Sequence, residues 1–139
     1  EPIQENFKLL ALNMPDNCEA HKLAISNEDN KTVSIAYKPD CPGGSSMLKY
    51  DDGVLQKCMT MTVSTLIKNK LIQQPDFIKM DIEGAETLAF KGITDTVLKK
   101  TRCIAMEMHN DVIGDEGVEY IYSRLTKLGY TEHSWSDSS

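Results

Sequence analysis

Two nearly continuous apolar runs, Phe77–Ile82 and Cys103–Met108, dominate the second half of the chain. Apolar residues in succession, without strict alternation, are typical of a parallel strand that is covered on both faces. Helical patterns lie between and after these runs: one ends at Gly92, one covers Thr94–Lys100, and one covers Val118–Leu128. This alternation of strands and helices predicts crossover connections, and therefore a parallel sheet in which the two runs are neighbours.

The first half of the chain has a mixed pattern. Apolar residues recur at helical spacing from Ile3 to Met14, and residues 18–26 then predict a short strand. Polar and apolar residues alternate over Thr32–Tyr37, which predicts a half-exposed antiparallel strand. Gly, Pro and Ser are frequent from Pro39 to Gly53, so we expect a long loop there.

Strand composition returns at Cys58–Val63, and Ser64 is expected to cap a helix over Leu66 and Ile67. The elements together predict one α/β domain over residues 1–139, a doubly wound fold with a mainly parallel sheet. A chain of 139 residues is long enough to bury a core of its own.

Charge and composition limit the kinds of partner that the chain can bind. The net charge of −6 argues against nucleic acid and against an anionic membrane surface, because both require a basic face. No apolar run approaches the length of a membrane span. The widely spaced cysteines include Cys58 and Cys103 inside apolar stretches, which predicts buried free thiols and a reducing, cytoplasmic compartment.

Ionisable residues follow both apolar runs, at the sheet edge where ligands bind in open parallel sheets. Asp81, Glu83 and Glu86 follow the first run, and Glu107 and His109 follow the second. Alternation places Asp81 and Glu83 on one side of their segment, and Glu107 and His109 on one side of theirs. If the strands are neighbours, these side chains share one rim, where they could act as a general base or hold a divalent metal.

Each of these residues also has a purely structural explanation. Asp81 and Glu83 could cap the following helix, and Glu86 could complement its dipole. This explanation is weakest for Asp81, because a lone carboxylate late in an apolar run is costly. His109 could be an ordinary loop histidine, although its place just after the second run favours a functional role at the rim. Lys79 interrupts the first run, and we expect it to snorkel or to pair with a carboxylate.

The segment from Phe77 to Gly92 resembles the signature of a known family. FIKMDIEGAE, followed by Leu88, Lys91 and Gly92, is similar to the FIKxDxEGxE…LxG pattern of the FkbM family of S-adenosylmethionine-dependent methyltransferases. Ile104–His109 resembles the next strand of that family. Weaker similarities to the family's EPxxxNxxxLxxN and VxxxTLD segments are found at Glu1-Pro2, Asn6, Leu9-Leu10, Asn13 and Val63–Leu66, with Ile67 where the family usually has Asp.

The resemblance implies a class I, Rossmann-like methyltransferase that holds S-adenosylmethionine at the carboxyl edge of the sheet. The methyl acceptor would be a hydroxyl of a saccharide or another small molecule. Carried over to this sequence, the family pattern implies that Glu1, Asp81 and Glu83 bind the cofactor. It implies that Asp81, His109 and Glu107 are catalytic, with His109 or Asp81 as the base. The resemblance adds no metal ligand.

The family pattern also includes elements that this sequence does not contain. The first strand and its glycine-rich loop would precede Glu1, and a terminal hairpin would extend past Ser139. We therefore expect a sheet that is incomplete at both ends, with one flank of the Phe77–Ile82 strand open. Three arrangements could satisfy that flank: segments upstream of Glu1, a strand from a second copy (a homo-oligomer) or a partner chain, or a sheet that closes differently. Without the missing amides, we expect the 139-residue chain alone to bind S-adenosylmethionine weakly or not at all.

Two other functions stay open at this point. One is a non-catalytic module, a truncated or degenerate domain that acts in binding or assembly. The other is a metal-dependent enzyme that uses Asp81, Glu83, Glu107 and His109 for different chemistry. A glycine-rich loop in the parent gene upstream of Glu1 would favour the methyltransferase, and a bound divalent ion with oxygen ligands would favour the metalloenzyme.

Overall fold

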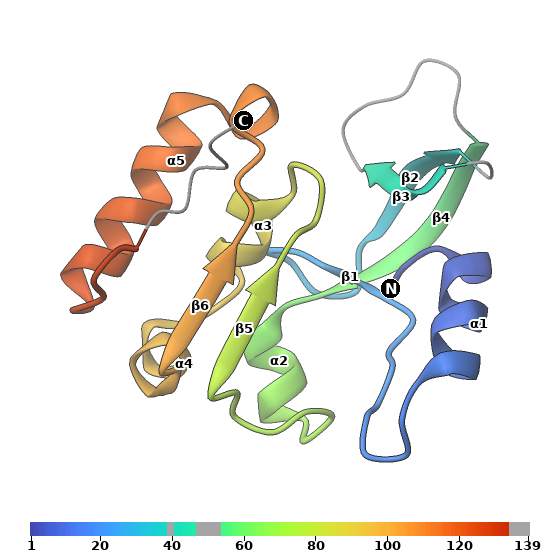
Figure 1. The fold of residues 1–139 in the computed structure, drawn as a ribbon, viewed down its shortest axis with the longest axis horizontal. Helices are drawn as coiled ribbons and strands as arrows, with labels where there is room; N and C mark the ends of the chain where they lie inside the picture. Colours follow the sequence, from blue (N-terminus) through green and yellow to red (C-terminus); the bar gives the residue numbers. More distant parts are fainter. Residues whose placement is uncertain (39–40, 47–53, 134–139) are drawn as a thin grey trace.

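The structure, a computed structural model, describes residues 1–38, 41–46 and 54–133, and only the backbone of residues 41–46. These residues form a mixed α/β arrangement with two small sheets (Figure 1). The first sheet has four strands in the order β1 (Ala24–Ile25), β4 (Val54–Met61), β2 (Thr32–Lys38) and β3 (Cys41–Ser46). The second pairs β5 (Phe77–Met80) with β6 (Cys103–Met106). The helices are α1 (Gln4–Asn13), α2 (Val63–Lys68), α3 (Glu86–Lys91), α4 (Asp95–Lys100) and α5 (Asn110–Lys127).

The two apolar runs are neighbours, as predicted. β5 and β6 pair in parallel with Phe77 opposite Cys103 and Met80 opposite Met106. The antiparallel prediction for Thr32–Tyr37 is also confirmed, because β2 runs antiparallel to both β3 and β4. The predicted single, mainly parallel sheet is not seen in the described part of the chain. Two sheets take its place, and only β1–β4 and β5–β6 are parallel pairs.

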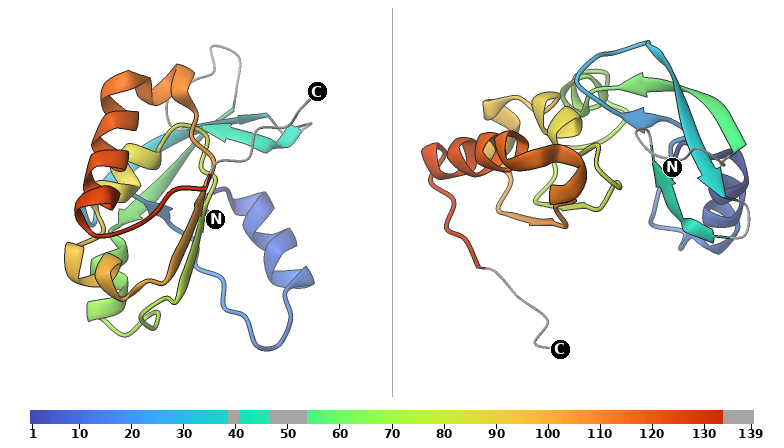
Figure 2. Two further views of the ribbon diagram at one scale, coloured as in Figure 1. Left: turned by 60° about the vertical axis from the view of Figure 1, so that its left-hand side comes forward. Right: turned by 90° about the horizontal axis from the view of Figure 1, so that it is seen from above.

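Among the described residues, helices cover one face of the β5–β6 sheet. The helices α3, α4 and α5 all lie on that face (Figure 2), where Ile78, Met80 and their neighbours on β6 join the core. The alternate positions point the other way, so Phe77 is 55% exposed and Cys103 is exposed as well. The prediction of strands covered on both faces is therefore wrong here, and so is the predicted burial of Cys103. The buried thiol predicted at Cys58 is confirmed.

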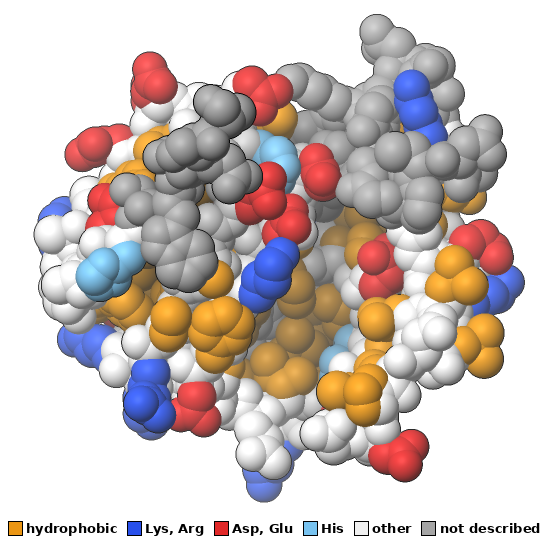
Figure 3. Space-filling view, viewed as in Figure 1, with side chains coloured by type: hydrophobic (Ala, Val, Ile, Leu, Met, Phe, Trp, Pro, Cys, Tyr) orange, Lys and Arg blue, Asp and Glu red, His pale blue; other side chains and the backbone are white. Residues whose placement is uncertain are grey.

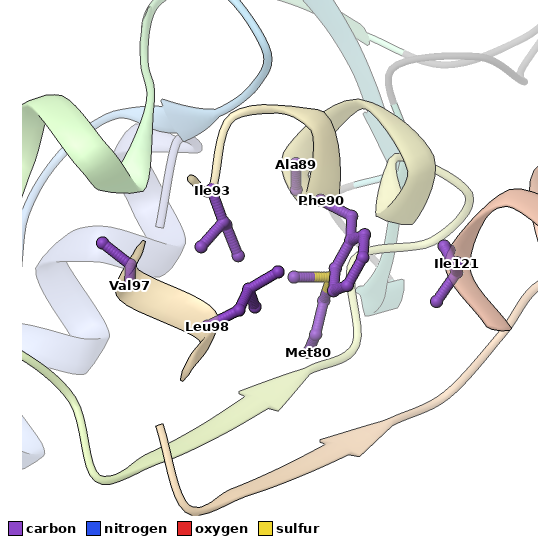
Figure 4. Packing of buried hydrophobic residues seen from close by; sticks show 7 residues of the cluster. All are labelled: Met80, Ala89, Phe90, Ile93, Val97, Leu98 and Ile121. Atoms are coloured by element: carbon purple, nitrogen blue, oxygen red, sulfur yellow. The ribbon is translucent and has the colours of Figure 1, made fainter. Parts of the chain in front are cut away.

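Each sheet has its own hydrophobic cluster. The cluster under β5 and β6 is larger, and its side chains point toward one another from β5, α3, α4 and α5 (Figure 4): Met80, Ala89, Phe90, Ile93, Val97, Leu98 and Ile121. The smaller cluster joins the N-terminus to the four-stranded sheet: Ile3, Ala24, Ile35 and Cys58. The parts of the chain that hold the two clusters approach each other closely at Gly92. A Cβ at this position would lie 2.1 Å from the backbone oxygen of Ser26.

Three local predictions need correction. The expected loop over Pro39–Gly53 contains β3, which pairs irregularly with the edge of β2; residues 39–40 and 47–53 lie outside the described ranges. The residue that caps α2 is Thr62, not Ser64. β4 ends at Met61, and Thr62 has an extended backbone conformation. The hydroxyl of Thr62 accepts a hydrogen bond from the Thr65 amide at 3.0 Å. The predicted strand over residues 18–26 shrinks to β1.

Within the described ranges, no helix is long and apolar enough to cross a membrane.

Candidate functional site

The candidate site lies at the carboxyl ends of β5 and β6. The Glu107 amide donates to the Met80 carbonyl at 2.9 Å, so the ladder continues one residue past both strands and brings Asp81 beside Glu107. One ligand atom from each of Asp81, Glu107 and His109 lies within 4.8 Å of the other two. The structure thus brings together the three residues for which the family resemblance implies a catalytic role. We call these residues, with Glu83 and Glu86, the carboxylate rim.

His109 lies between two carboxylates of the rim. Its Nδ1 is 2.8 Å from Oε1 of Glu86, and its Nε2 is 3.4 Å from Oε2 of Glu83. Its position is fixed by the backbone as well, because His109 is the N-cap residue of α5 and its carbonyl accepts from the amides of Val112 and Ile113. Only 18% of the imidazole is exposed.

Glu86 is the residue of the rim whose role sequence reasoning missed. Its carboxylate is 0% exposed, although a buried carboxylate is expensive. Oε1 accepts from the Gly84 amide at 3.0 Å in addition to its contact with His109. Oε2 is buried and, among the described residues, has no hydrogen-bond partner. The sequence does contain a signal for this burial: Glu86 stands between Ala85 and Ala89, which belong to the apolar face of the helix. Both alanines are buried in the structure, where a solvated charge does not fit.

The turn between β5 and α3 shapes the rim. Glu83 and Gly84 both have positive φ, 53° and 95°. Gly84 also permits a close approach, because a Cβ there would lie 2.3 Å from Cγ1 of Val112 in the first turn of α5. The N-cap position of α3 belongs to Ala85, so the capping explanation fails for Asp81 and Glu83. The turn instead directs Glu83 and Glu86 to His109.

Lys79 pairs with Asp81, as the sequence suggested. Lys79 Nζ lies 3.0 Å from Oδ2 of Asp81 on the bare face of the sheet. Their side chains are 65% and 36% exposed, so solvent screens the pair and it contributes little to stability. Asp81 therefore stays available to a ligand that approaches from this face.

Electrostatics favour a positive charge at His109. Burial lowers the pKa of the imidazole, but its hydrogen bond to Glu86 and the charges of Glu86, Glu83 and Glu107 outweigh burial, so the pKa of His109 is raised above 6.5. The rim is thus an environment that stabilises cations.

Glu1 lies away from the rim, at the start of α1 beside the four-stranded sheet (Figure 1). Its carboxylate accepts from the Ile3 amide at 2.8 Å, and its amino group donates to the His21 carbonyl at 3.1 Å. A cavity of about 400 Å³ also lies outside the rim, between Asn17–His21 and Lys70–Gln73, near the amino end of β5. Neither feature belongs to the cluster of Asp81, Glu107 and His109.

A strand, a crossover helix and a second parallel strand, with acidic residues at their carboxyl ends, place the site where Rossmann-like enzymes bind their ligands. A family model described as the methyltransferase FkbM domain matches residues 1–131. The chain belongs to the FkbM methyltransferase family, and methyl transfer is its class of activity. Comparisons with curated proteins and with solved structures gave no match.

Proposed function

We propose that the carboxylate rim transfers a methyl group from S-adenosylmethionine to a hydroxyl of a saccharide or another small molecule. The observation that carries this proposal is the convergence of Asp81, Glu107 and His109 at the carboxyl edge of β5 and β6, within an FkbM domain. Methyl transfer needs a positioned acceptor and a route for its proton, and the rim offers groups for both.

The charge of the rim fits the cofactor. S-adenosylmethionine supplies an activated methyl group on a cationic sulfur, so its chemistry needs little covalent help from the protein. Asp81 and Glu83 would hold the sulfonium end, since both carboxylates adjoin the cluster around His109. Glu1 would hold the ribose hydroxyls, across the space between the two sheets.

On the acceptor side, the proposed catalytic residues are Asp81, His109 and Glu107. An acceptor hydroxyl must lose its proton before or during methyl transfer, and His109 and Asp81 are the candidate groups for that step. Glu86 keeps the imidazole of His109 in one orientation through the contact at Nδ1, which leaves Nε2 turned to the rim. Glu107 would accept a hydrogen bond from the acceptor and orient it.

We also propose that the two sheets are parts of one Rossmann-like domain over residues 1–139, and that a further strand pairs with the other edge of β5. Within the described ranges, β5 pairs only with β6, so the backbone groups of its other edge have no strand partner. A space-filling view shows the surface hollowed between the two sheets, with hydrophobic side chains at its base (Figure 3). A strand there would satisfy the edge, whether it comes from this protein, a second copy or a partner chain.

The free edge also supports the alternative function, a non-catalytic module that binds or assembles through β5. The two proposals differ in one property, because the module would not consume S-adenosylmethionine. We expect no nucleic acid or membrane as partner, given the net charge of −6. A cytoplasmic location fits the described cysteines, Cys18, Cys58 and Cys103, which form no disulfide.

The test is methyl transfer by the protein as it occurs in the cell. The protein is incubated with S-adenosylmethionine and a panel of saccharides and small alcohols, and the products are analysed by mass spectrometry. We expect S-adenosylhomocysteine and an O-methylated acceptor in equal amounts. Methylation only of nitrogen or of a carboxyl group would reject the proposed acceptor class. Absence of S-adenosylhomocysteine with every acceptor would favour the non-catalytic module.

A further inference from the structure

The carboxylate rim has the residue types and the spacing of a divalent-cation site. We propose that Asp81, Glu107 and His109 bind one divalent cation of the Mg²⁺ and Mn²⁺ class, and that this cation binds the acceptor hydroxyl. Binding of the cation stands on the geometry of the rim alone. Its use in catalysis rests on the proposed function.

The distances fit a cation with few adjustments. Ligand oxygens and nitrogens that surround such an ion at about 2.1 Å lie about 3.0 to 4.2 Å from one another. The ligand atoms of Asp81, Glu107 and His109 lie within 4.8 Å of one another. Asp81 and Glu107 are exposed, so rotation of their side chains can bring the ligand atoms to these spacings. Lys79 holds one oxygen of Asp81 through a screened surface pair, which a divalent ion can displace.

Glu86 provides an independent reason to expect a cation. Histidines that bind metals nearly always donate their second ring N–H to a carboxylate or carbonyl, which fixes the tautomer and turns the other nitrogen to the metal. His109 has this arrangement, with Nδ1 held at 2.8 Å by the fully buried Glu86. The second oxygen of Glu86 is buried without a hydrogen-bond partner among the described residues, so one acceptor beside the imidazole is left unsatisfied.

The remaining contacts of His109 point the same way. Without a metal ion, a proton on Nε2 meets Glu83 at 3.4 Å, with Asp81 and Glu107 close by. A divalent cation at Nε2 would replace that proton and bring more positive charge to the same carboxylates. The rim holds four carboxylates, of Asp81, Glu83, Glu86 and Glu107, against the cationic side chains of Lys79 and His109.

The ligand set selects the class of ion. Carboxylate oxygens favour Mg²⁺ and Mn²⁺, and a single imidazole shifts the preference toward Mn²⁺. Three protein ligands leave coordination positions open for water or substrate oxygen. A hydroxyl bound to such an ion becomes more acidic, which helps it to lose its proton at neutral pH. In the cation-bound form Asp81 and His109 are ligands, so the base role proposed for them would pass to Glu83, which lies in the rim but outside the ligand set.

Mn²⁺ titration of the full natural protein, without cofactor or acceptor, tests the site. The electron paramagnetic resonance signal of aqueous Mn²⁺ reports the free ion, and electron spin echo envelope modulation reports nitrogen bound to it. We expect one Mn²⁺ per chain, a nitrogen coupling, and displacement by excess Mg²⁺. Mn²⁺ that stays free at millimolar concentration would overturn the proposal, and so would bound Mn²⁺ without nitrogen coupling.

Variants identify the ligands. We expect Asp81→Asn, Glu107→Gln and His109→Gln each to weaken Mn²⁺ binding about tenfold or more, and His109→Gln to abolish the nitrogen coupling. Glu86→Gln should weaken binding about tenfold while it keeps the coupling, because Glu86 acts through His109. Asp16→Asn and Glu119→Gln remove exposed carboxylates outside the rim and should leave binding unchanged. Circular dichroism checks the fold of each variant, and equal Mn²⁺ affinity in all folded variants would overturn the assignment.

Two results distinguish an error in the cation site from an error in the proposed methyl transfer. If the protein methylates a hydroxyl equally well after complete removal of divalent ions, the proposed use of a cation in catalysis is wrong, and the proposed methyltransferase function is retained. If Mn²⁺ binds with nitrogen coupling and no acceptor is methylated, the cation site stands and the proposed acceptor class is wrong.

Discussion

The carboxylate of Glu86 lies 2.8 Å from Nδ1 of His109 and joins the first turn of α3 to the N-cap residue of α5. Close packing between the two helices supports this contact. A Cβ on Gly117 would lie 2.7 Å from the Thr87 hydroxyl, and the rings of Phe90 and Tyr120 meet edge to face at 6.4 Å. The orientation of the imidazole therefore depends on how α3 packs against α5.

Glu86→Gln should change the tautomer of His109. A carboxylate only accepts hydrogen bonds, so in the wild type neutral His109 carries its proton on Nδ1. A glutamine amide can accept or donate, and we expect a mixture of tautomers in the variant. Nitrogen chemical shifts of the imidazole in the metal-free protein measure this difference, with Glu119→Gln as the control. Identical shifts in wild type and Glu86→Gln would show that the contact does not set the tautomer.

The position of the rim followed from the sequence because two local rules were sufficient. Continuous apolar runs around a helical segment predicted adjacent parallel strands, and β5 and β6 are adjacent and parallel. Residues that follow adjacent parallel strands share one edge, which brought Asp81, Glu107 and His109 together.

Long-range packing was harder to predict. Pattern alone does not show which face of a strand a helix covers, so the exposure of Phe77 and Cys103 was missed. The separation into two sheets depends on which strands pair with β5. Among the described residues only β6 does, and no local pattern in β5 indicates this. The local pattern around Glu86 favours a dipole role, and it does not indicate the contact with His109, because that contact spans 23 positions along the chain.

Phe90→Ala should destabilise the protein far more than Phe77→Ala. Phe90 is 0% exposed at the centre of the larger cluster, so truncation should lower the free energy of unfolding by about 3–5 kcal/mol. Phe77 is 55% exposed, and we expect a loss below about 1 kcal/mol. Urea unfolding measures both. A loss at Phe77 as large as that at Phe90 would show that another segment covers this face in the natural protein.

Gly92→Ala tests the junction between the two parts of the fold. The added Cβ would meet the backbone oxygen of Ser26 at 2.1 Å, and a backbone atom cannot move aside as a flexible side chain does. We expect a loss of about 1–3 kcal/mol in the free energy of unfolding. Thr96→Ala, at an exposed position in α4, is the matched control and should be nearly neutral. Equal stability of Gly92→Ala and wild type would contradict the close approach.

Asp29 should contribute to the acid sensitivity of the fold. Its carboxylate accepts from the Thr65 hydroxyl at 2.6 Å and from the Thr62 amide at 2.7 Å, and these bonds hold its pKa below 3.8. A folded-state pKa below the unfolded value means that the stabilisation is present above pH 3.8 and is lost as the pH falls through the folded pKa. We expect Asp29→Asn to lower the free energy of unfolding at pH 7. We also expect the free energy of unfolding to decrease less between pH 7 and pH 3 in this variant than in the wild type, as measured by urea unfolding. Asp16→Asn should do neither.

The central claim is that the rim carries out methyl transfer, and turnover of Asp81→Asn tests it most directly. The natural protein, with the acceptor that it methylates fastest, is compared with Asp81→Asn by the rate of S-adenosylhomocysteine formation. We predict a loss of about 100-fold or more, with an unchanged circular dichroism spectrum, because the carboxylate contacts the reacting groups. Asp16→Asn should keep the wild-type rate. A folded Asp81→Asn protein that also keeps the wild-type rate would contradict the account and assign Asp81 a structural role only.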